Sequence, residues 1–156
     1  DVTSIKNTLM SYRGVSHRME YVDTIDGVDY YNDSKGTNPD STDVALASLT
    51  KPIHLLAGGF DKGSDFKALF EKHAAAITGL YVFGATKAVI KEEAKDAGIK
   101  NVSEYETMKE ATEAAMARAV EGEAVLLSPA CASWDQFPNY RVRGDEFKEI
   151  VRERRS

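Results

Sequence analysis

The sequence has one cysteine, Cys131, in 156 residues, which excludes an internal disulfide and any cysteine-rich zinc site. It has no run near the roughly 20 apolar residues of a membrane-spanning helix, and its first residues lack the basic and apolar segments of a signal peptide. The sequence has fewer positively than negatively charged residues, 20 Lys and Arg compared with 25 Asp and Glu. The net charge of −5 argues against a general nucleic-acid binder, so we expect partners that are neither nucleic acids nor membranes.

An initiator methionine is also missing, and we therefore expect either a piece of a longer polypeptide or a processed chain. The single cysteine fits a reducing cytoplasm. What the sequence does contain is enough apolar material for a core, with 42% hydrophobic and 29% charged residues. Its length predicts one domain over residues 1–156.

Short apolar runs alternate with longer amphipathic stretches. Four continuous runs predict buried strands: Tyr30-Tyr31, Pro52–Ala57, Leu80–Phe83 and Ala124–Leu127. The segment Met19–Thr24 predicts a further strand, and the turn at residues 25–27 predicts that this strand forms a hairpin with Val28–Asn32.

Apolar residues with helical spacing lie between these runs. They predict helices at Asp40–Leu49, Asp65–Ala76, Lys87–Ala97, Met108–Val120 and Asp145–Arg154. Strands that alternate with helices predict an α/β fold, here a Rossmann-like three-layer domain with a mostly parallel sheet and an N-terminal β-hairpin. Ligands of such sheets bind at the carboxyl ends of the strands, so the segments after the apolar runs form the candidate site.

The first of these segments is the polar loop Asn32–Pro39. Asn38 is a suitable N-cap and Pro39 a suitable first helical residue, so the loop leads into a helix N-terminus, where free N–H groups attract anions. Lys35 adds a positive charge, and Asp33 could hold a ribose hydroxyl, a metal-bound water or Lys35 itself. From the chemistry alone, an ordinary polar turn explains the loop equally well.

The second segment is Ala57–Gly63, which begins with a buried strand end and two glycines. The glycines permit a close approach of the backbone to a ligand, and Lys62 could meet a carboxylate or a phosphate. The segment matches neither a Walker A loop nor a dinucleotide fingerprint. A glycine-rich turn with a surface lysine is the competing interpretation.

The third segment, Leu127–Phe137, combines small residues and hydroxyls with the single tryptophan, Trp134. An aromatic side chain in such a loop indicates a lid or a pocket wall, with half-buried packing as the alternative. Cys131 has no evident histidine partner, and we do not expect a catalytic thiol. The three histidines, at positions 17, 54 and 73, lack the spacing of metal ligands, so no protein-held metal and no catalytic residue are predicted.

The three segments together resemble the C-terminal domain of the Mur ligase family, through NDSKGTN at 32–38, GGFDKGSDF at 58–66 and LSPACASWDQF at 127–137. GVSHRME at 14–20 fits as well, and the motifs keep the family's order along nearly the whole chain. Within the family, the motifs are most similar to those of members that add D-glutamate to a peptidoglycan precursor. The resemblance implies part of a longer bacterial cytoplasmic enzyme, an ATP-dependent, ADP-forming amide ligase that works through acyl phosphate and tetrahedral intermediates.

The resemblance also implies roles for individual residues. D-Glutamate would be bound by Thr37, Lys62, Ser133 and the backbone at Tyr140, and ATP or ADP would be contacted by Arg18, Asp33 and Lys35. The other substrate, UDP-N-acetylmuramoyl-L-alanine, and most contacts to Mg²⁺ would belong to N-terminal and central domains of the same polypeptide. The isolated domain is therefore expected to be inactive.

Other interpretations stay open at this point. A related ligase could add another amino acid, although Lys62, Ser133 and the Tyr140 segment favour an acidic one. The chain could also be a stand-alone α/β module that binds a nucleotide or a small anion without catalysis. A pure interaction module would leave the three loops unexplained.

Overall fold

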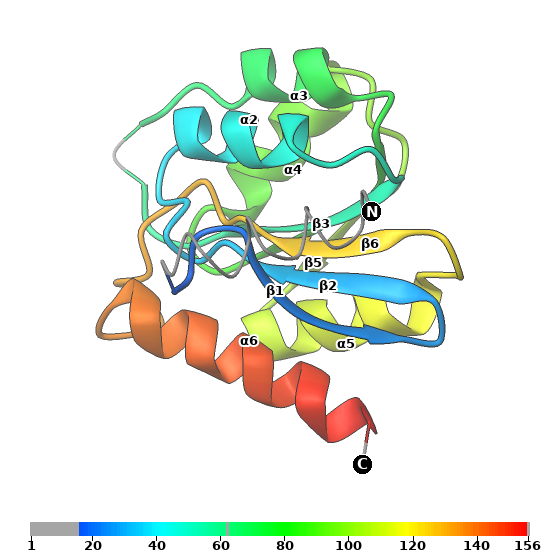
Figure 1. Ribbon diagram of the computed structural model, residues 1–156. Coiled ribbons are helices and arrows are strands. Elements are labelled where there is room, and N and C mark those ends of the chain that lie inside the picture. Colours follow the sequence, from blue (N-terminus) through cyan, green and yellow to red (C-terminus); the bar gives the residue numbers. More distant parts are fainter. Residues whose placement is uncertain (1–15, 62, 156) are drawn as a thin grey trace.

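A six-stranded sheet forms the centre of the molecule (Figure 1), and the computed structural model describes residues 16–61 and 63–155. The strands are β1 (Glu20–Ile25), β2 (Val28–Asn32), β3 (Ile53–Gly58), β4 (Ile77–Phe83), β5 (Val102–Tyr105) and β6 (Ala124–Leu127). Their order in the sheet is β1-β2-β6-β3-β4-β5. Among the strand pairs of the described residues, only β1–β2 is antiparallel, so the predicted mostly parallel sheet with an N-terminal hairpin is confirmed.

The hairpin turn consists of Asp26 and Gly27, between the paired residues Ile25 and Val28. Both turn residues have positive φ, 52° and 78° respectively. A two-residue turn of this kind matches the right-handed twist of the strands, and Asp-Gly is a favoured sequence for it. The turn therefore fixes the register of the hairpin.

Helices cover both faces of the sheet, which gives the three layers (Figure 1). The helices are α2 (Pro39–Ala47), α3 (Lys67–His73), α4 (Lys87–Asp96), α5 (Met108–Arg118) and α6 (Tyr140–Arg155). The first three lie on one face, and α5 and α6 lie on the other.

Two hydrophobic cores fill the spaces between the layers. Leu55 and Ala57 of β3 point into the core under α2, α3 and α4, whereas Leu56, between them, points into the core under α5 and α6. All three residues are fully buried. This is why the central strands have continuous apolar runs: each face of the sheet needs apolar side chains.

The prediction missed one strand and misplaced several helix ends. β5 was not predicted because Val102–Tyr105 is a short edge strand whose residues are only partly buried or are exposed. The last helix begins at Tyr140 and not at the predicted Asp145. Its first turn was not predicted because Arg143 and Gly144, on its buried face, interrupt the apolar pattern. The predicted helix Asp65–Ala76 is shorter in the structure, Lys67–His73, and Asp40–Leu49 becomes Pro39–Ala47.

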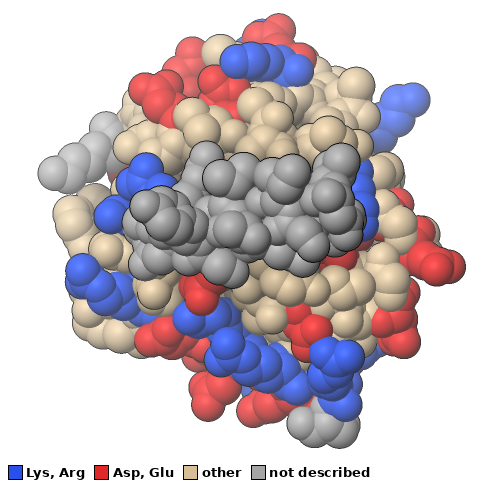
Figure 2. All heavy atoms as spheres, viewed as in Figure 1, with Lys and Arg blue, Asp and Glu red and all other residues tan. Residues whose placement is uncertain are grey.

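Charged side chains of both signs gather over α6 on the lower part of the face seen in Figure 2. The helix ends in Arg152, Arg154 and Arg155, which complement the negative end of its dipole. Arg155 also ion-pairs with Asp23 of β1. None of the described helices is both long and apolar enough to cross a membrane.

Candidate functional site

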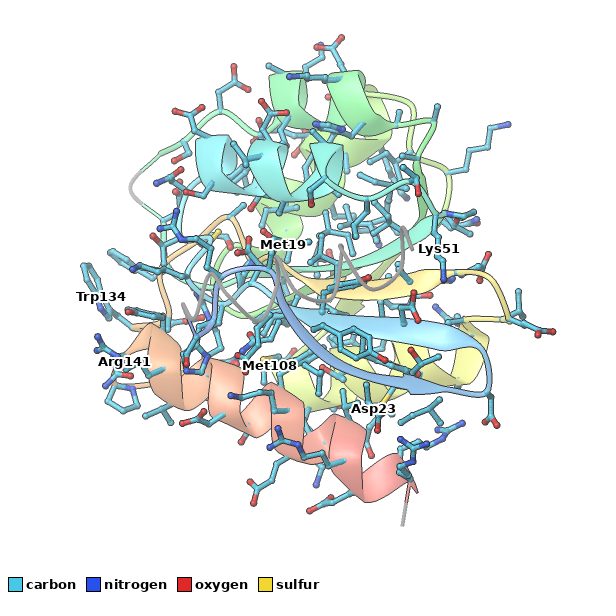
Figure 3. The ribbon with its side chains drawn as sticks, in the orientation of Figure 1. Met19, Asp23, Lys51, Met108, Trp134 and Arg141 are labelled. Atoms are coloured by element: carbon cyan, nitrogen blue, oxygen red, sulfur yellow. The ribbon has the colours of Figure 1, made fainter. Side chains whose placement is uncertain are left out.

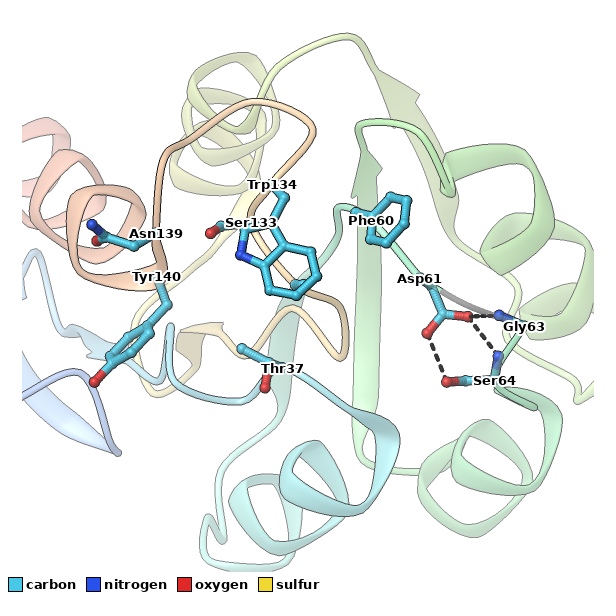
Figure 4. Close-up of a pocket in the computed structure, with 10 residues that line it drawn as sticks. Thr37, Phe60, Asp61, Gly63, Ser64, Ser133, Trp134, Asn139 and Tyr140 are labelled. Carbon is cyan, nitrogen blue, oxygen red and sulfur yellow. Dashed lines mark hydrogen bonds between the residues drawn. The ribbon is translucent and has the colours of Figure 1, made fainter.

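A cavity of about 580 Å³ lies where β2, β3 and β6 end (Figure 4). Its walls come from the loops after these strands and from the start of α6. It is lined by Thr37, Phe60, Asp61, Gly63, Ser64, Ala132, Ser133, Trp134, Asn139 and Tyr140. Three of the four residues predicted to bind the amino acid, Thr37, Ser133 and Tyr140, therefore meet in one cavity.

Backbone hydrogen bonds join the loops that form the cavity. Phe60 and Ala132 exchange two of them, at 2.8 and 2.9 Å, and the Ala130 N–H donates to the Gly36 carbonyl at 2.9 Å. Gly59 makes the first contact possible, because its φ of 138° suits glycine and an added Cβ would meet the Ala132 carbonyl oxygen. The walls are thus tied together through main-chain atoms.

Ser133 is the clearest sign of a ligand site in this cavity. The residue is 2% exposed, and within residues 16–61 and 63–155 its Oγ is the one buried side-chain N or O atom without a hydrogen-bond partner. A buried hydroxyl without a partner costs about 1–3 kcal/mol. A polar ligand in the cavity would remove that cost.

Thr37 lies two residues before α2. Asn38 caps this helix, its Oδ1 accepting a hydrogen bond from the Ser41 N–H at 2.9 Å, and Pro39 is the first helical residue, as predicted. Thr37 is therefore next to a helix N-terminus, where the dipole favours negative charge.

Trp134 and Phe60 form an aromatic wall of the cavity, with ring centroids 5.8 Å apart. The Trp134 side chain remains largely exposed, at 64%. The structure thus favours the predicted pocket wall over half-buried packing, and it leaves the indole able to report on the cavity.

In the second predicted loop, Ala57–Gly63, the side chain of Asp61 stabilises a turn. Its carboxylate accepts hydrogen bonds from the N–H of Gly63 at 2.8 Å and from the Oγ of Ser64 at 2.6 Å (Figure 4). Lys62 lies outside the described residues, and its predicted role remains a prediction. Its neighbours Asp61 and Gly63 both line the cavity.

Of the three residues predicted to contact the nucleotide, Lys35 lies beside Tyr140, and Arg18 is near enough to Asp33 for its charge to act on that carboxyl. The Lys35 ammonium is 5.9 Å from the centroid of the Tyr140 ring. The backbone N–H of Lys35 donates to the carbonyl of His17, the residue before Arg18. Asp33 is buried and accepts hydrogen bonds from Ser128 Oγ at 2.7 Å and from the Met19 N–H at 3.1 Å. Burial raises the pKa of the Asp33 carboxyl, against the opposing effects of these hydrogen bonds and of the Arg18 charge.

Arg143 is a residue that the sequence did not single out, although it organises the site. It is fully buried in α6 and donates to Ser34 Oγ at 2.9 Å, the Ser34 carbonyl at 2.7 Å and the Cys131 carbonyl at 3.0 Å. Ser34 Oγ in turn donates to the Tyr140 carbonyl at 2.7 Å. Burial lowers the pKa of the Arg143 guanidinium to about 10, which leaves it charged at neutral pH.

Two further predictions concern Cys131 and the histidines. Burial raises the pKa of the Cys131 thiol to about 12, which agrees with the expectation that it is no nucleophile. His54 is buried in β3, and His73 Nε2 is hydrogen-bonded to Asp43 Oδ1 at 2.6 Å.

His17 is buried against the start of α6. Its Nδ1 is 2.9 Å from Asn32 Nδ2, and its ring meets the Tyr140 ring edge-on. The pKa of His17 is lowered, chiefly by burial and then by the charge of Lys148, while Asp145 raises it. The folded protein thus favours the neutral imidazole.

This burial predicts a pH dependence of stability. Below pH about 6.5 the unfolded chain binds a proton at His17 that the folded chain resists, so the free energy of unfolding falls as the pH falls. In urea titrations at pH 7, 6 and 5, His17→Gln should reduce this slope, by less than the about 1.4 kcal/mol per pH unit of one full proton. Equal slopes in the two proteins would contradict the assignment.

Comparison with known proteins identifies the family of the chain. The model of the Mur ligase family, glutamate ligase domain, matches residues 17–131, which contain five of the ten residues that line the cavity. The chain belongs to this family. Among curated relatives, the UDP-N-acetylmuramoylalanine–D-glutamate ligase of Alkaliphilus oremlandii is 44% identical over 97% of the chain, and that of Clostridioides difficile is 45% identical over 97%. The chain spans about a third of the length of these relatives, 33% and 34%.

Solved structures of Mur ligases and of FolC share the fold of this family member. The UDP-N-acetylmuramate–alanine ligase MurC of Thermotoga maritima has a TM-score of 0.64 at 16% identity, over 98% of this chain and 34% of that one. Escherichia coli FolC in complex with ADP has a TM-score of 0.63 at 15% identity, over 91% and 33%. At these identities the likeness concerns the fold alone.

Proposed function

We propose that this member of the Mur ligase family is the amino-acid-binding domain of an ATP-dependent ligase that adds D-glutamate to UDP-N-acetylmuramoyl-L-alanine. The relatives named for this activity share 44–45% of their aligned residues with the chain. The observation that carries the proposal is the buried, unpartnered Ser133 hydroxyl in a cavity that Thr37 and Tyr140 also line.

The cavity suits a ligand with two carboxylates. Thr37, just before α2, and the Ser133 hydroxyl offer hydrogen bonds from different walls, and we propose that Lys62 and the Tyr140 backbone complete the set. Donors fixed in different directions can distinguish two enantiomers, because the wrong one leaves buried polar groups unpaired. The backbone links between the loops hold these donors in place.

The nucleotide would bind on the other side of Tyr140. Arg18 and Lys35 supply positive charge there, which fits phosphate groups. Asp33 already accepts two hydrogen bonds within the domain, and its second role would be to position Lys35 and the ribose through a fixed carboxylate. ATP would supply the phosphoryl group that activates the substrate carboxylate when it is bound.

The remaining parts of the reaction belong elsewhere in this proposal. The described residues include no group of three or more His, Cys, Asp or Glu side chains that could hold a metal ion, so Mg²⁺ would be held mainly by upstream domains of the same polypeptide. Those domains would also bind the UDP-linked substrate. We propose that residues 1–156 form one domain, inactive alone, of a bacterial cytoplasmic enzyme of peptidoglycan synthesis.

Trp134 provides the test, since it is the single tryptophan and lines the cavity. The chain is titrated with D-glutamate and with L-glutamate, each with and without Mg-ADP, while indole fluorescence is recorded. A saturable change with D-glutamate, absent with L-glutamate and lost in Ser133→Ala, is expected. Equal responses to both enantiomers, or no loss in Ser133→Ala, would contradict the proposed binding mode. Ser48→Ala, a hydroxyl removed elsewhere, is the control.

A further inference from the structure

A second cavity lies at the amino ends of the strands, where β3, β4 and β5 begin. It has a volume of about 420 Å³ and is lined by His54, Thr78, Gly79, Tyr81, Lys100, Asn101, Val102, Ser103 and Arg118. Figure 3 labels Trp134 and Lys51, the residue shortly before β3, at the two opposite ends of the sheet. The second cavity is therefore separate from the site described above, and its volume lies in the roughly 300–1,000 Å³ range of small-molecule sites.

The charged side chains that line this cavity are positive, and the carboxylate of Glu123 lies behind His54, with its Oε1 2.8 Å from His54 Nε2. The side chains that line it include Lys100 and Arg118, and none of the nine lining residues carries a carboxylate. The whole chain, by contrast, has a net charge of −5. A cavity with two cations and several neutral hydrogen-bonding groups favours an anionic ligand.

The sheet is locally irregular at this cavity. Between the pairs Ile53–Ile77 and His54–Gly79, β4 contains one extra residue, Thr78, which makes a bulge. A Cβ added at Gly79 would lie 2.9 Å from Tyr81 Oη and 3.2 Å from His54 Nδ1. Bulges and strand glycines often mark a place where a ligand comes close to the sheet.

Buried polar groups fix the inner wall. Glu123 Oε1 accepts from His54 Nε2 at 2.8 Å, and His54 Nδ1 is 2.8 Å from Tyr81 Oη. His54 and Tyr81 are thus hydrogen-bonded to each other within the wall. The donors left for a ligand are those of Lys100, Arg118 and the segment that leads into β5.

Arg118 is positioned by the same wall. Its guanidinium lies 5.6 Å from the centroid of the Tyr81 ring and donates one hydrogen bond to Ser103 Oγ at 3.1 Å. An arginine that stacks on an aromatic ring loses less freedom when it binds, because the ring already restricts its rotamers. Its planar group of donors fits the oxygens of a phosphate or a carboxylate.

We propose that this cavity binds a small molecule through an oxyanion, a phosphate or a carboxylate group, held between Lys100 and Arg118, whose guanidinium lies over the Tyr81 ring. The site is independent of the proposed amino-acid pocket, which lies at the carboxyl ends of the strands. It would give the domain a second ligand, bound at the amino ends of the strands.

Backbone amide NMR of the chain tests this proposal, with inorganic phosphate and succinate as probes at constant ionic strength. Saturable shifts are expected at Gly79, Asn101 and Ser103, and the probe that binds more tightly identifies the kind of oxyanion. The double variant Lys100→Gln/Arg118→Gln should weaken binding by about ten-fold or more. The control Lys109→Gln/Arg152→Gln removes the same charge from exposed positions on α5 and α6 and should leave binding unchanged.

Three outcomes would overturn the proposal. The first is the absence of saturable shifts at these amides with either probe. The second is an equal loss of binding in both double variants, which would indicate non-specific attraction to positive charge. The third is a set of shifts confined to the loops around Thr37 and Ser133, which would place the anion in the other cavity. The spectra themselves show whether each variant is folded.

Discussion

Replacing Arg143 with methionine is expected to lower the free energy of unfolding by about 3 kcal/mol. The substitution keeps the unbranched, apolar part of the side chain but removes three hydrogen bonds, to Ser34 Oγ, the Ser34 carbonyl and the Cys131 carbonyl. Each buried oxygen left without a donor costs about 1–3 kcal/mol, and the removal of a buried charge offsets part of the sum. Urea denaturation followed by circular dichroism measures the change.

Arg152→Met is the matched control, because it makes the same exchange at an exposed position of the same helix. It should change the free energy of unfolding by less than about 0.5 kcal/mol. Arg143→Lys separates charge from geometry: a lysine keeps the positive charge but cannot supply donors in the directions of the guanidinium. If Arg143→Lys were as stable as the original protein, the hydrogen bonds would not be the reason for the effect.

The same substitution should also affect the proposed amino-acid site. Arg143 connects the loop after β2, through Ser34, with the loop after β6, through Cys131. These loops carry Thr37 and Ser133. We therefore expect weaker D-glutamate binding in any Arg143→Lys protein that still folds.

Replacing Gly59 with alanine is expected to cost about 3 kcal/mol of stability, from two sources. The φ of 138° is unfavourable for alanine, and the new Cβ would meet the Ala132 carbonyl oxygen. That carbonyl accepts the hydrogen bond from the Phe60 N–H, so relief of the clash separates two walls of the cavity. Urea denaturation gives the stability, and Trp134 fluorescence shows the change in the cavity.

Gly98→Ala is the control for the backbone contribution alone. Gly98 also has a positive φ, 98°, but an added Cβ there meets nothing within 4 Å. We expect it to cost about 1 kcal/mol, the backbone strain without the clash. Equal costs at the two positions would mean that the contact with Ala132 is unimportant.

The sequence predicts most of this fold because its signals are local. Leu55, Leu56 and Ala57 form a continuous apolar run since both faces of the sheet are covered, and the Asp26-Gly27 turn has a sequence typical of its conformation. β5 lacks such a signal, because an edge strand of four partly buried or exposed residues needs no apolar run. The start of α6 was hidden by Arg143, a charged residue at a core position.

The candidate site was predictable in part. Thr37, Ser133 and Tyr140 were singled out through the resemblance to the family, and they line one cavity. The motifs said nothing of Arg143, whose role depends on the long-range approach of Ser34 and Cys131 to α6. They also missed the cavity around Tyr81, because its residues come from separate strand starts and from the end of α5. Such contacts arise only when the chain has folded.

The place of β6 in the sheet has a consequence for folding. This strand, formed near the end of the chain, lies between β2 and β3 and pairs Leu126 with Tyr31 on one side and with Leu55 on the other. The hairpin and the other strands therefore cannot join before residue 127 has been synthesised. Closing so long a loop slows folding, and a nascent chain shorter than this would expose two unpaired strand edges to chaperones and to aggregation.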